Sequence, residues 1–261
     1  MIKLLSTDFD GTLVGNDREE SCVAPLALEL ETIKREGALW CINTGRPLTY
    51  LLHGLEHFAP PIRPDYLITQ ERYLFYDDPE KGWIPLGDWN ALCDRKHQEL
   101  FEASQLFFQK MKALVAQDPR LTLLQSSRGS PDCLASEDEQ ALHEMMLELL
   151  RMPERPDDFS FQPSTSYQEH FLSFHHRHYN KGTALEALRQ FLSLHVEQIM
   201  AIGDHHNDLA MLDSSIAAML ACPSNAHPRV KEAILKGKGH IARSAYGEGT
   251  AEAISFFHGR R

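Results

Sequence analysis

The sequence is poor in the features that mark secreted or membrane proteins. It has five cysteines in 261 residues, widely spaced and with no Cys-x-x-Cys or Cys-x-His cluster. This odd, scattered set argues for reduced thiols rather than a disulfide framework. No apolar run approaches the roughly 18 residues of a membrane span, and Asp8 and Asp10 follow the first residues too soon for a signal peptide. We therefore expect a cytoplasmic protein with no membrane contact.

Positive charge is also scarce. Lysine and arginine number 26 against 37 aspartates and glutamates, which gives a net charge of −11. This balance argues against a nucleic-acid partner and against a polybasic membrane contact. It leaves room for an anionic substrate, because one local cation or metal reverses the sign of a site. With 43% hydrophobic and 24% charged residues, the chain is typical of a globular protein that buries a core without disulfides.

Both ends of the chain alternate between short apolar segments and amphipathic helices. A helix is predicted where Val23, Leu26, Leu30 and Ile33 recur, and Gly37 ends it. The alternation resumes at Lys181 and continues to the end of the chain. Such β-α-β-α-β alternation predicts a parallel sheet with flanking helices. The segments predicted as strands in the first part are Ile2–Thr7, Ala38–Ile42, Tyr66–Thr69 and Tyr73–Tyr76.

The middle of the chain has a different pattern of apolar residues. The spacing predicts one long helix from Leu100 to Leu114, and Ser136 with Glu139 reads as a capping box of another helix. Thr44 and Lys181 are 137 residues apart, whereas a βαβ unit needs only about 30. We therefore predict an inserted α+β domain. The predicted boundaries are 1–84 and 177–261 for the core and 85–176 for the insertion, with an apolar stripe at Phe107, Phe108 and Met111 in its interior.

Polar residues follow several of the predicted strands or open the next helix. In an open parallel sheet, ligands bind beyond the carboxyl ends of the strands, so these residues are expected to converge. Carboxylates that meet there repel one another unless a cation neutralises them. An all-oxygen cluster points to a hard ion, and Mg²⁺ is usual where phosphate also binds. The residues are Asp8, Asp10, Thr44, Lys181, Asp204 and Asp208.

The other groups at this edge suit a phosphoryl group. Lys181 adds a positive charge, Thr44 adds a hydroxyl donor, and Gly11 lets the chain turn with its amides facing the site. One carboxylate can then attack phosphorus and form an aspartyl-phosphate. A second, two residues along, can protonate the leaving oxygen and later deprotonate water.

Four ordered motifs resemble those of the haloacid-dehalogenase (HAD) superfamily. They are Asp8-Phe9-Asp10-Gly11-Thr12, Thr44-Gly45-Arg46, Lys181-Gly182 and Gly203-Asp204-His205-His206-Asn207-Asp208. Within the superfamily the chain is most similar to the Cof-type and sucrose-phosphatase-like phosphatases. The resemblance implies an α/β fold with a Rossmann-like HAD core, a parallel sheet and an inserted α+β cap domain of the C2 type. Such a cap would close over the site, exclude water and select the leaving group.

The resemblance also implies a role for each matching position. Asp8 would be the nucleophile and Asp10 the general acid/base. The implied Mg²⁺ ligands are Asp8, Asp10 through its backbone carbonyl, Asp204 and Asp208. The implied phosphate-binding residues are Thr44, Gly45, Lys181 and Asn207. The implied substrate contacts are Gly11, Arg46 and Asn225.

Two positions depart from the family pattern. His205 stands where a small serine or threonine is usual, which alters water or metal contacts. Thr69-Gln70-Glu71-Arg72 stands where an Asn-Gly pair commonly follows the third strand, so the usual substrate-side contacts are in question.

Other interpretations of single residues stay open. Thr44 also suits the cap of a helix that begins at Pro47, and Asn225 also suits a plain turn. The histidines near the end of the insertion and in the last motif suit an exposed hinge, an anion contact or a transition-metal site. They are His170, His175, His176, His178, His205 and His206.

Together these features predict a Mg²⁺-dependent phosphatase whose partner is a small phosphorylated metabolite, with a sugar phosphate favoured by the resemblance. A phosphotransferase or phosphomutase of the same fold is one alternative, because water and a sugar hydroxyl compete for the same aspartyl-phosphate. A non-catalytic ligand-sensing module is the other.

Overall fold

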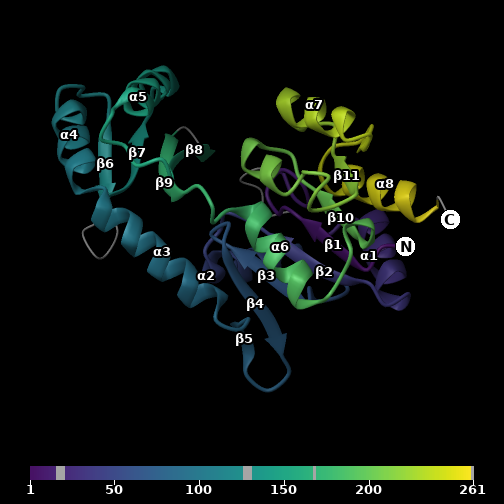
Figure 1. The fold of residues 1–261 in the computed structure, drawn as a ribbon. Helices are drawn as coiled ribbons and strands as arrows, with labels where there is room; N and C mark the ends of the chain where they lie inside the picture. The colour runs from purple at the N-terminus through teal and green to yellow at the C-terminus, as the bar shows by residue number, and fades with distance from the viewer. Residues whose placement is uncertain (16–20, 126–130, 167–168, 260–261) are drawn as a thin grey trace. The chain divides into compact units, whose positions relative to one another are not determined.

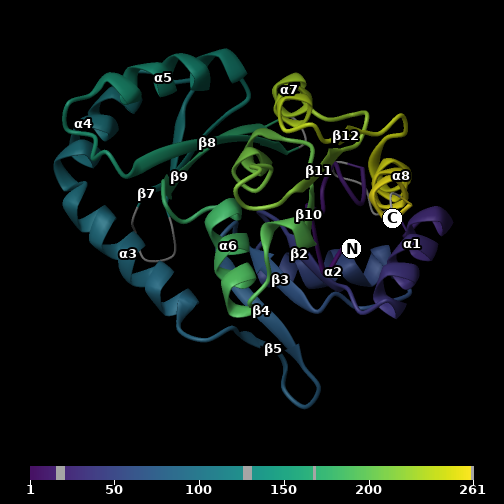
Figure 2. The same cartoon turned by 45° about the vertical axis from the view of Figure 1, so that its right-hand side comes forward.

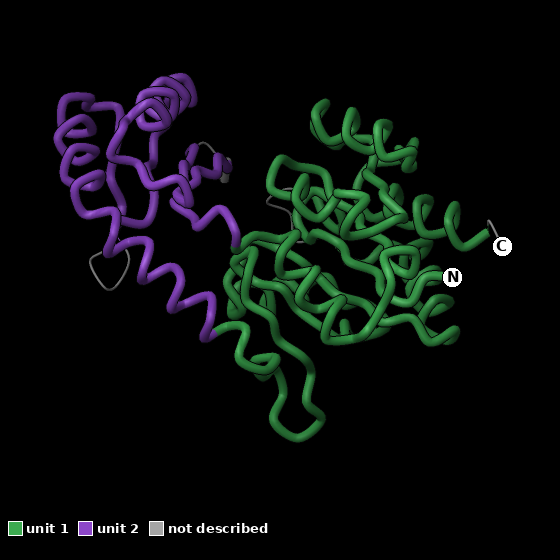
Figure 3. The backbone as a smooth tube through the Cα atoms, viewed as in Figure 1, with its two compact units in different colours: residues 1–90, 179–261 green, residues 91–178 purple. Residues whose placement is uncertain are grey.

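The computed structural model describes residues 1–15, 21–125, 131–166 and 169–259. The chain forms two compact units: unit 1 contains residues 1–90 and 179–261, and unit 2 contains residues 91–178 (Figure 3). None of the helices in these described ranges is long and apolar enough to cross a membrane.

Unit 1 is built on an eight-stranded sheet in the order β12-β11-β10-β1-β2-β3-β4-β5 (Figure 1). The strands from β12 to β3 are parallel, as the alternation predicts. The strand bounds are β1 (Leu4–Thr7), β2 (Leu39–Asn43), β3 (Tyr66–Thr69), β4 (Tyr73–Asp78), β5 (Gly82–Pro85), β10 (Ile199–Ile202), β11 (Met219–Cys222) and β12 (His240–Ile241).

The prediction of a parallel sheet fails at one edge, because β4 and β5 run antiparallel. Thr69 pairs with Tyr73 across a very short connection. A parallel partner needs a crossover of a dozen or more residues, so the chain can only turn back here.

Helices cover both faces of this sheet (Figure 2). Neighbouring side chains of one strand, such as Leu4 and Leu5 or Trp40 and Cys41, are buried in separate apolar layers. The first layer includes residues of α1, α2 and α8, and the second includes residues of α6 and α7. The sheet is therefore buried on both sides, as expected of a parallel α/β fold. The helix bounds are α1 (Ala24–Arg35), α2 (Leu48–Phe58), α6 (Lys181–Phe191), α7 (Pro228–Lys236) and α8 (Tyr246–His258), with short 3₁₀ helices η1 (Val196–Gln198) and η2 (His206–Ala210).

Unit 2 has the α+β composition expected of the insertion. Its four-stranded antiparallel sheet has the order β6-β7-β9-β8. Phe107, Phe108 and Met111 are buried in its core, so the interpretation of this stripe as core is confirmed. The elements are α3 (Trp89–Ala103), which begins in unit 1, α4 (Gln105–Val115), β6 (Thr122–Gln125), β7 (Pro131–Ser136), α5 (Glu139–Arg151), β8 (Phe159–Ser166) and β9 (Glu169–His176).

Two local predictions in unit 2 are wrong. The predicted long helix is two helices, interrupted at Ser104, whose hydroxyl donates to the carbonyl of Leu100 at 2.7 Å. The N-cap of α5 is Asp138, whose carboxylate accepts from the backbone amides of Gln140 and Ala141, two and three residues further on. Ser136 instead donates to the carbonyl of Arg120. Both Ser136 and Asp138 are good caps, and tertiary contacts decide between them.

Candidate active site

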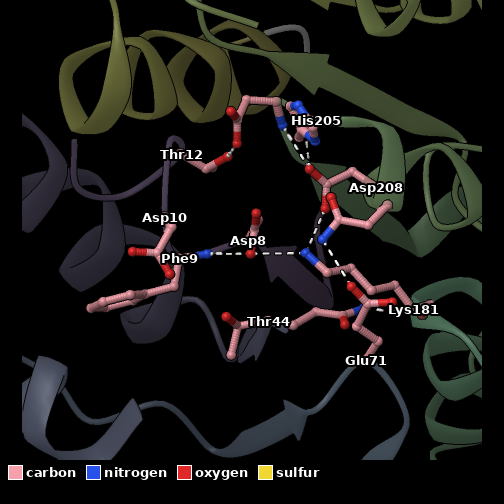
Figure 4. Close-up of polar contacts among 12 residues, drawn as sticks. Asp8, Phe9, Asp10, Thr12, Thr44, Glu71, Lys181, His205 and Asp208 are labelled. Carbon is pink, nitrogen blue, oxygen red and sulfur yellow. Dashed lines mark hydrogen bonds and ion pairs between the residues drawn. The ribbon is translucent and has the colours of Figure 1, made fainter. Parts of the chain in front are cut away.

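The predicted site residues come from neighbouring strands of unit 1. Asp8 follows β1, Thr44 follows β2 and Asp204 lies two residues after β10, while Lys181 opens α6. The order β10-β1-β2 places three parallel carboxyl ends side by side. Figure 4 shows Asp8, Thr44 and Lys181, with Asp208, around one centre.

A buried lysine joins two of the carboxylates. The Lys181 ammonium donates to Asp208 Oδ1 at 2.7 Å and lies 2.9 Å from Asp8 Oδ1 (Figure 4). The lysine and Asp208 are fully buried, and Asp8 is nearly so. Asp8 Oδ1 also accepts from the amide of Phe9 at 2.7 Å. This oxygen is held by two donors, whereas the described residues give Asp8 Oδ2 no hydrogen bond, so Oδ2 is the oxygen available for reaction or metal binding.

The second oxygen of Asp208 closes the loop after β10. Asp208 Oδ2 accepts from the amides of Asp204 and His205, both at 2.9 Å. A side chain on Gly203 would place its Cβ 2.4 Å from Cγ of Asp208, so only glycine fits there. Asp208 is thus fixed at both oxygens.

Asp204 faces the turn after β1. Its Oδ1 accepts from the Thr12 hydroxyl at 3.0 Å. Gly11 has φ +75°, and a Cβ there would lie 2.2 Å from Asp204 Oδ2. The sequence therefore requires glycine at this position for both backbone conformation and space.

The buried charges shift one another's pKa values. Burial raises the pKa of Asp204 to about 7, and the charge of Asp208 adds to the shift. Burial and then Asp208 also raise the pKa of Asp8. Burial alone would lower the pKa of Lys181, but the carboxylates of Asp208, Asp8 and Glu71 more than offset this, so the ammonium stays charged.

The donor set fits a hard cation. Asp8, Asp204 and Asp208 each place an oxygen within 4.8 Å of the others, and within the described ranges no other group of three or more ligating side chains does so. One lysine does not neutralise these carboxylates, and burial, followed by the charge of Asp208, raises the pKa of both Asp8 and Asp204. Oxygen-only ligands and unbalanced negative charge are what Mg²⁺ requires.

Thr44 and Gly45 line the side of the site that the resemblance assigns to phosphate. Thr44 Oγ1 accepts from the amide of Arg46 at 3.1 Å, so its hydroxyl hydrogen is available to an anion. The backbone amide of Thr44 donates to Ile68 on β3 at 2.8 Å. A Cβ at Gly45 would lie 3.5 Å from the carboxylate of Glu71.

Arg46 lies beside the expected general acid/base. Its Nε and Nη2 bind the two oxygens of Asp10 at 2.7 and 2.5 Å. Its guanidinium carbon lies 4.9 Å from the ring centroid of Phe9. A Cβ at Gly54 on α2 would lie 2.7 Å from Arg46 Nη1, so that glycine makes room for the arginine. No local pattern predicts this bidentate pair, whose members are 36 residues apart.

The two asparagines have different surroundings. The side chain of Asn225 donates to the carbonyl of Gly11 at 2.7 Å and accepts from the backbone amide of Tyr246 at 2.9 Å. Both ends of its amide group therefore bind backbone atoms. Asn207 donates its Nδ2 to Glu71 Oε1 at 3.0 Å. Their assignments to substrate and phosphate stay predictions.

Glu71 is a residue that sequence reasoning missed. It is 6% exposed, and its charge acts on Lys181. The available signal was the departure from Asn-Gly in Thr69–Arg72, which puts a charged side chain in a short turn between two apolar strands.

The histidines of the last motif form a ring cluster with His227. The centroid separations are 4.9 Å for His205 and His206, 4.0 Å for His206 and His227, and 5.9 Å for His205 and His227. Burial lowers the pKa of His205 and of His206. Of the other histidines, His176 is buried in unit 2, with its ring 5.7 Å from that of His97.

A family model and a curated relative each match nearly the whole chain. A family model described as sucrose-6F-phosphate phosphohydrolase matches residues 1–258. A phosphoglycolate phosphatase of Methanothrix thermoacetophila is 28% identical over 257 residues, covering 97% of this chain and 96% of that protein. One from Methanothermobacter thermautotrophicus is 36% identical over 80 residues, which span 31% of this chain and 34% of that relative's length.

Among solved structures, the sucrose-phosphatase of Synechocystis sp. PCC6803, in complex with sucrose and phosphate, superposes with a TM-score of 0.67. The match covers 99% of both chains at 20% sequence identity. At that identity the similarity shows a shared fold.

Proposed function

The chain belongs to the sucrose-6F-phosphate phosphohydrolase family of the haloacid-dehalogenase superfamily, and from this premise we propose that it is a Mg²⁺-dependent phosphatase acting through an aspartyl-phosphate. Its relatives are named phosphatases, and the enzyme is a phosphoric monoester hydrolase. The observation that carries the proposal is the buried cluster in which Lys181 pairs with both Asp8 and Asp208, with Asp204 beside it. Buried like charges are costly, so such a cluster points to chemistry rather than stability.

The metal would be held by Asp8, Asp204 and Asp208, with the backbone carbonyl of Asp10 as a further ligand. When bound, Mg²⁺ would offset the carboxylate charge and the charge that develops on the phosphoryl oxygens. Lys181 and the hydroxyl of Thr44 would bind phosphoryl oxygens as well, because both are donors on buried side chains.

In the first half-reaction, an oxygen of Asp8 attacks phosphorus. A bond from Asp8 Oδ2 to phosphorus forms, and the ester P–O bond breaks. The leaving oxygen takes a proton from Asp10. Lys181 and the Phe9 amide hold Asp8 Oδ1 in place during the attack, which fixes the direction of Oδ2.

In the second half-reaction, Asp10 accepts a proton from water as the water oxygen attacks phosphorus. The bond from phosphorus to Asp8 then breaks and inorganic phosphate leaves. Arg46 holds the carboxylate of Asp10 through both oxygens and thereby orients it.

The substrate we propose is a small sugar phosphate, on the ground of the family and of the sucrose complex of the Synechocystis protein. Unit 2 would act as the cap that selects the leaving group. A panel of phosphorylated metabolites, assayed for phosphate release with Mg²⁺ and no acceptor, tests this. Release from sugar phosphates supports the proposal, whereas preference for phosphoglycolate, the substrate named in several relatives, corrects the substrate class. No release from any compound refutes the function.

Metal dependence is tested in the same assay. Phosphate release should disappear after chelation, return with Mg²⁺ and fail with Ca²⁺, because Ca²⁺ takes more ligands in looser geometry. Full activity after exhaustive chelation would contradict the proposed metal role.

A further inference from the structure

The turn between β3 and β4 holds two residues in an unfavourable backbone conformation. Gln70 has φ +48° and Glu71 has φ +64°. The amide of Arg72 closes the turn on the carbonyl of Thr69 at 3.1 Å. Such turns favour Asn-Gly, because most residues with a side chain are disfavoured in the left-handed region. Strain of this kind is retained where a side chain is needed.

The side chain of Glu71 joins two parts of the site. Its Oε1 accepts from Asn207 Nδ2 at 3.0 Å, in the loop that carries Asp204 and Asp208. The backbone amide of Glu71 donates to the carbonyl of Thr44 at 3.0 Å. Glu71 therefore links the loop expected to bind phosphate with the loop expected to bind metal.

A carboxylate only accepts hydrogen bonds, so it fixes the orientation of the Asn207 amide. The NH₂ group must face Glu71, and the amide oxygen must face the other way. That oxygen, Asn207 Oδ1, is buried and has no hydrogen-bond partner in the described structure. A buried acceptor without a donor is unfavourable, so a bound species that donates to it is favoured.

Phosphoryl oxygens cannot fill this position, because they are acceptors too. The donor must carry O–H or N–H, and water is the one that the hydrolysis itself requires. We propose that Glu71 is a positioning residue, which fixes Asn207 so that its Oδ1 accepts a hydrogen bond from a water molecule in the reaction complex. This inference rests on the proposed phosphatase function.

The variant E71G tests the role of the carboxylate. Glycine suits φ +64°, so the fold should persist while the acceptor for Asn207 is lost. We expect kcat to fall about 10- to 100-fold, the range for partners that orient a reacting group, with KM little changed. The matched control is Q70G, which relieves the same strain at the exposed neighbouring residue and should keep the wild-type kcat.

Two substrates distinguish whether the hydrogen-bond donor to Asn207 Oδ1 is water or a hydroxyl group of the substrate. An aryl phosphate without hydroxyl groups and a sugar phosphate should lose kcat equally in E71G. A loss confined to the sugar phosphate would overturn the assignment to water. Wild-type kcat in E71G, or an equal loss in Q70G, would overturn the role of the carboxylate.

An NMR measurement tests the orientation without relying on activity. The Asn207 side-chain NH₂ signals, assigned by their absence in N207D, should exchange slowly with solvent in the wild type and in Q70G and rapidly in E71G. Equally rapid exchange in the wild type would overturn the proposal even if the enzyme is an active phosphatase. An inactive wild type with slow exchange would instead refute the proposed function and leave the Glu71–Asn207 geometry supported.

Discussion

Unit 1 buries charged groups beside its apolar layers, whereas the core of unit 2 is centred on a cluster of aromatic rings. Lys181, Asp8, Asp204 and Asp208 of unit 1 are all at most 5% exposed. In unit 2, Arg120 is an exposed cation that also pairs with several carboxylates. Burying the charged groups of unit 1 costs free energy of folding, whereas the solvent-exposed ion pairs of Arg120 contribute little to it. The difference indicates that the buried charges of unit 1 reduce the stability of the fold and are retained for chemistry. The interior of unit 2, by contrast, stabilises the fold.

The interior of unit 2 shows the contrast most clearly. Phe159 is fully buried, with its ring 5.0 Å from that of Phe107 and 5.6 Å from that of Phe108. Such clusters stabilise by apolar burial and edge-to-face contacts. Substitutions in the two units should therefore separate activity from stability.

Asp8→Asn should have the largest effect on activity. It keeps the size of the side chain and removes the attacking charge, so phosphate release should fall at least about 100-fold and reach background. The matched control is Asp132→Asn on the surface of unit 2, which should leave the rate unchanged. Steady-state kinetics with thermal melts check both variants, and retention of more than about a hundredth of the rate would place the nucleophile elsewhere.

Lys181→Met should damage both activity and stability. It leaves Asp8 and Asp208 without their shared ammonium, and breaking a buried ion pair costs about 3–5 kcal/mol. Arg120→Met removes an exposed cation that has three carboxylate partners, one more than Lys181, and should barely change the melting temperature. Denaturant unfolding of the two variants tests the comparison between the units, and equal destabilisation would contradict it.

Phe159→Ala should affect stability far more than chemistry. Truncating a buried phenylalanine costs about 3–5 kcal/mol of folding stability. The first unfolding transition should therefore shift to a lower temperature. We expect kcat on an aryl phosphate to stay within about threefold of the wild type below that transition, because the proposed reacting groups all lie in unit 1. A loss of kcat as large as that of Lys181→Met would show that unit 2 shapes the chemistry directly.

The smallest expected effect is the pH dependence of the metal-free protein. The pKa of Asp204 is raised from 3.8 to about 7, so the folded state keeps a proton that the unfolded chain releases. The contribution of this group to stability therefore falls as pH rises from about 4 to about 7. Mg²⁺ should raise the melting temperature more at pH 8 than at pH 5, where it must displace that proton. An equal shift at both pH values, or an unchanged difference in Asp204→Asn, would count against the raised pKa.

Much of the fold and the site was predictable from sequence, for a common reason. Apolar alternation places Leu4 and Leu5 on opposite faces of the sheet, and parallel strands bring their carboxyl ends together. These two rules alone are enough to predict that Asp8 and Asp204 lie close together. The antiparallel β4 was also within reach, since three residues between strands do not allow a crossover.

The rest depended on side-chain reach and on choices between near-equal alternatives. Arg46 contacts Asp10 beside Gly54 of the helix that follows it, where a Cβ would lie 2.7 Å from Arg46 Nη1. Glu71 lies in a backbone conformation that its own propensity opposes, so no local rule predicts its burial. Ser136 and Asp138 are equally good caps on local grounds, and contacts with Arg120 involve both.

The most direct test of the account is to trap the phosphorylated enzyme. Rapid acid quenching during turnover, followed by digestion and mass spectrometry, should find one phosphoryl group on the peptide that contains Asp8. The label should require Mg²⁺ and be absent in Asp8→Asn, because the buried Asp8–Lys181–Asp208 cluster is the proposed site of covalent chemistry. A phosphoryl group on a different residue during turnover would contradict the central claim.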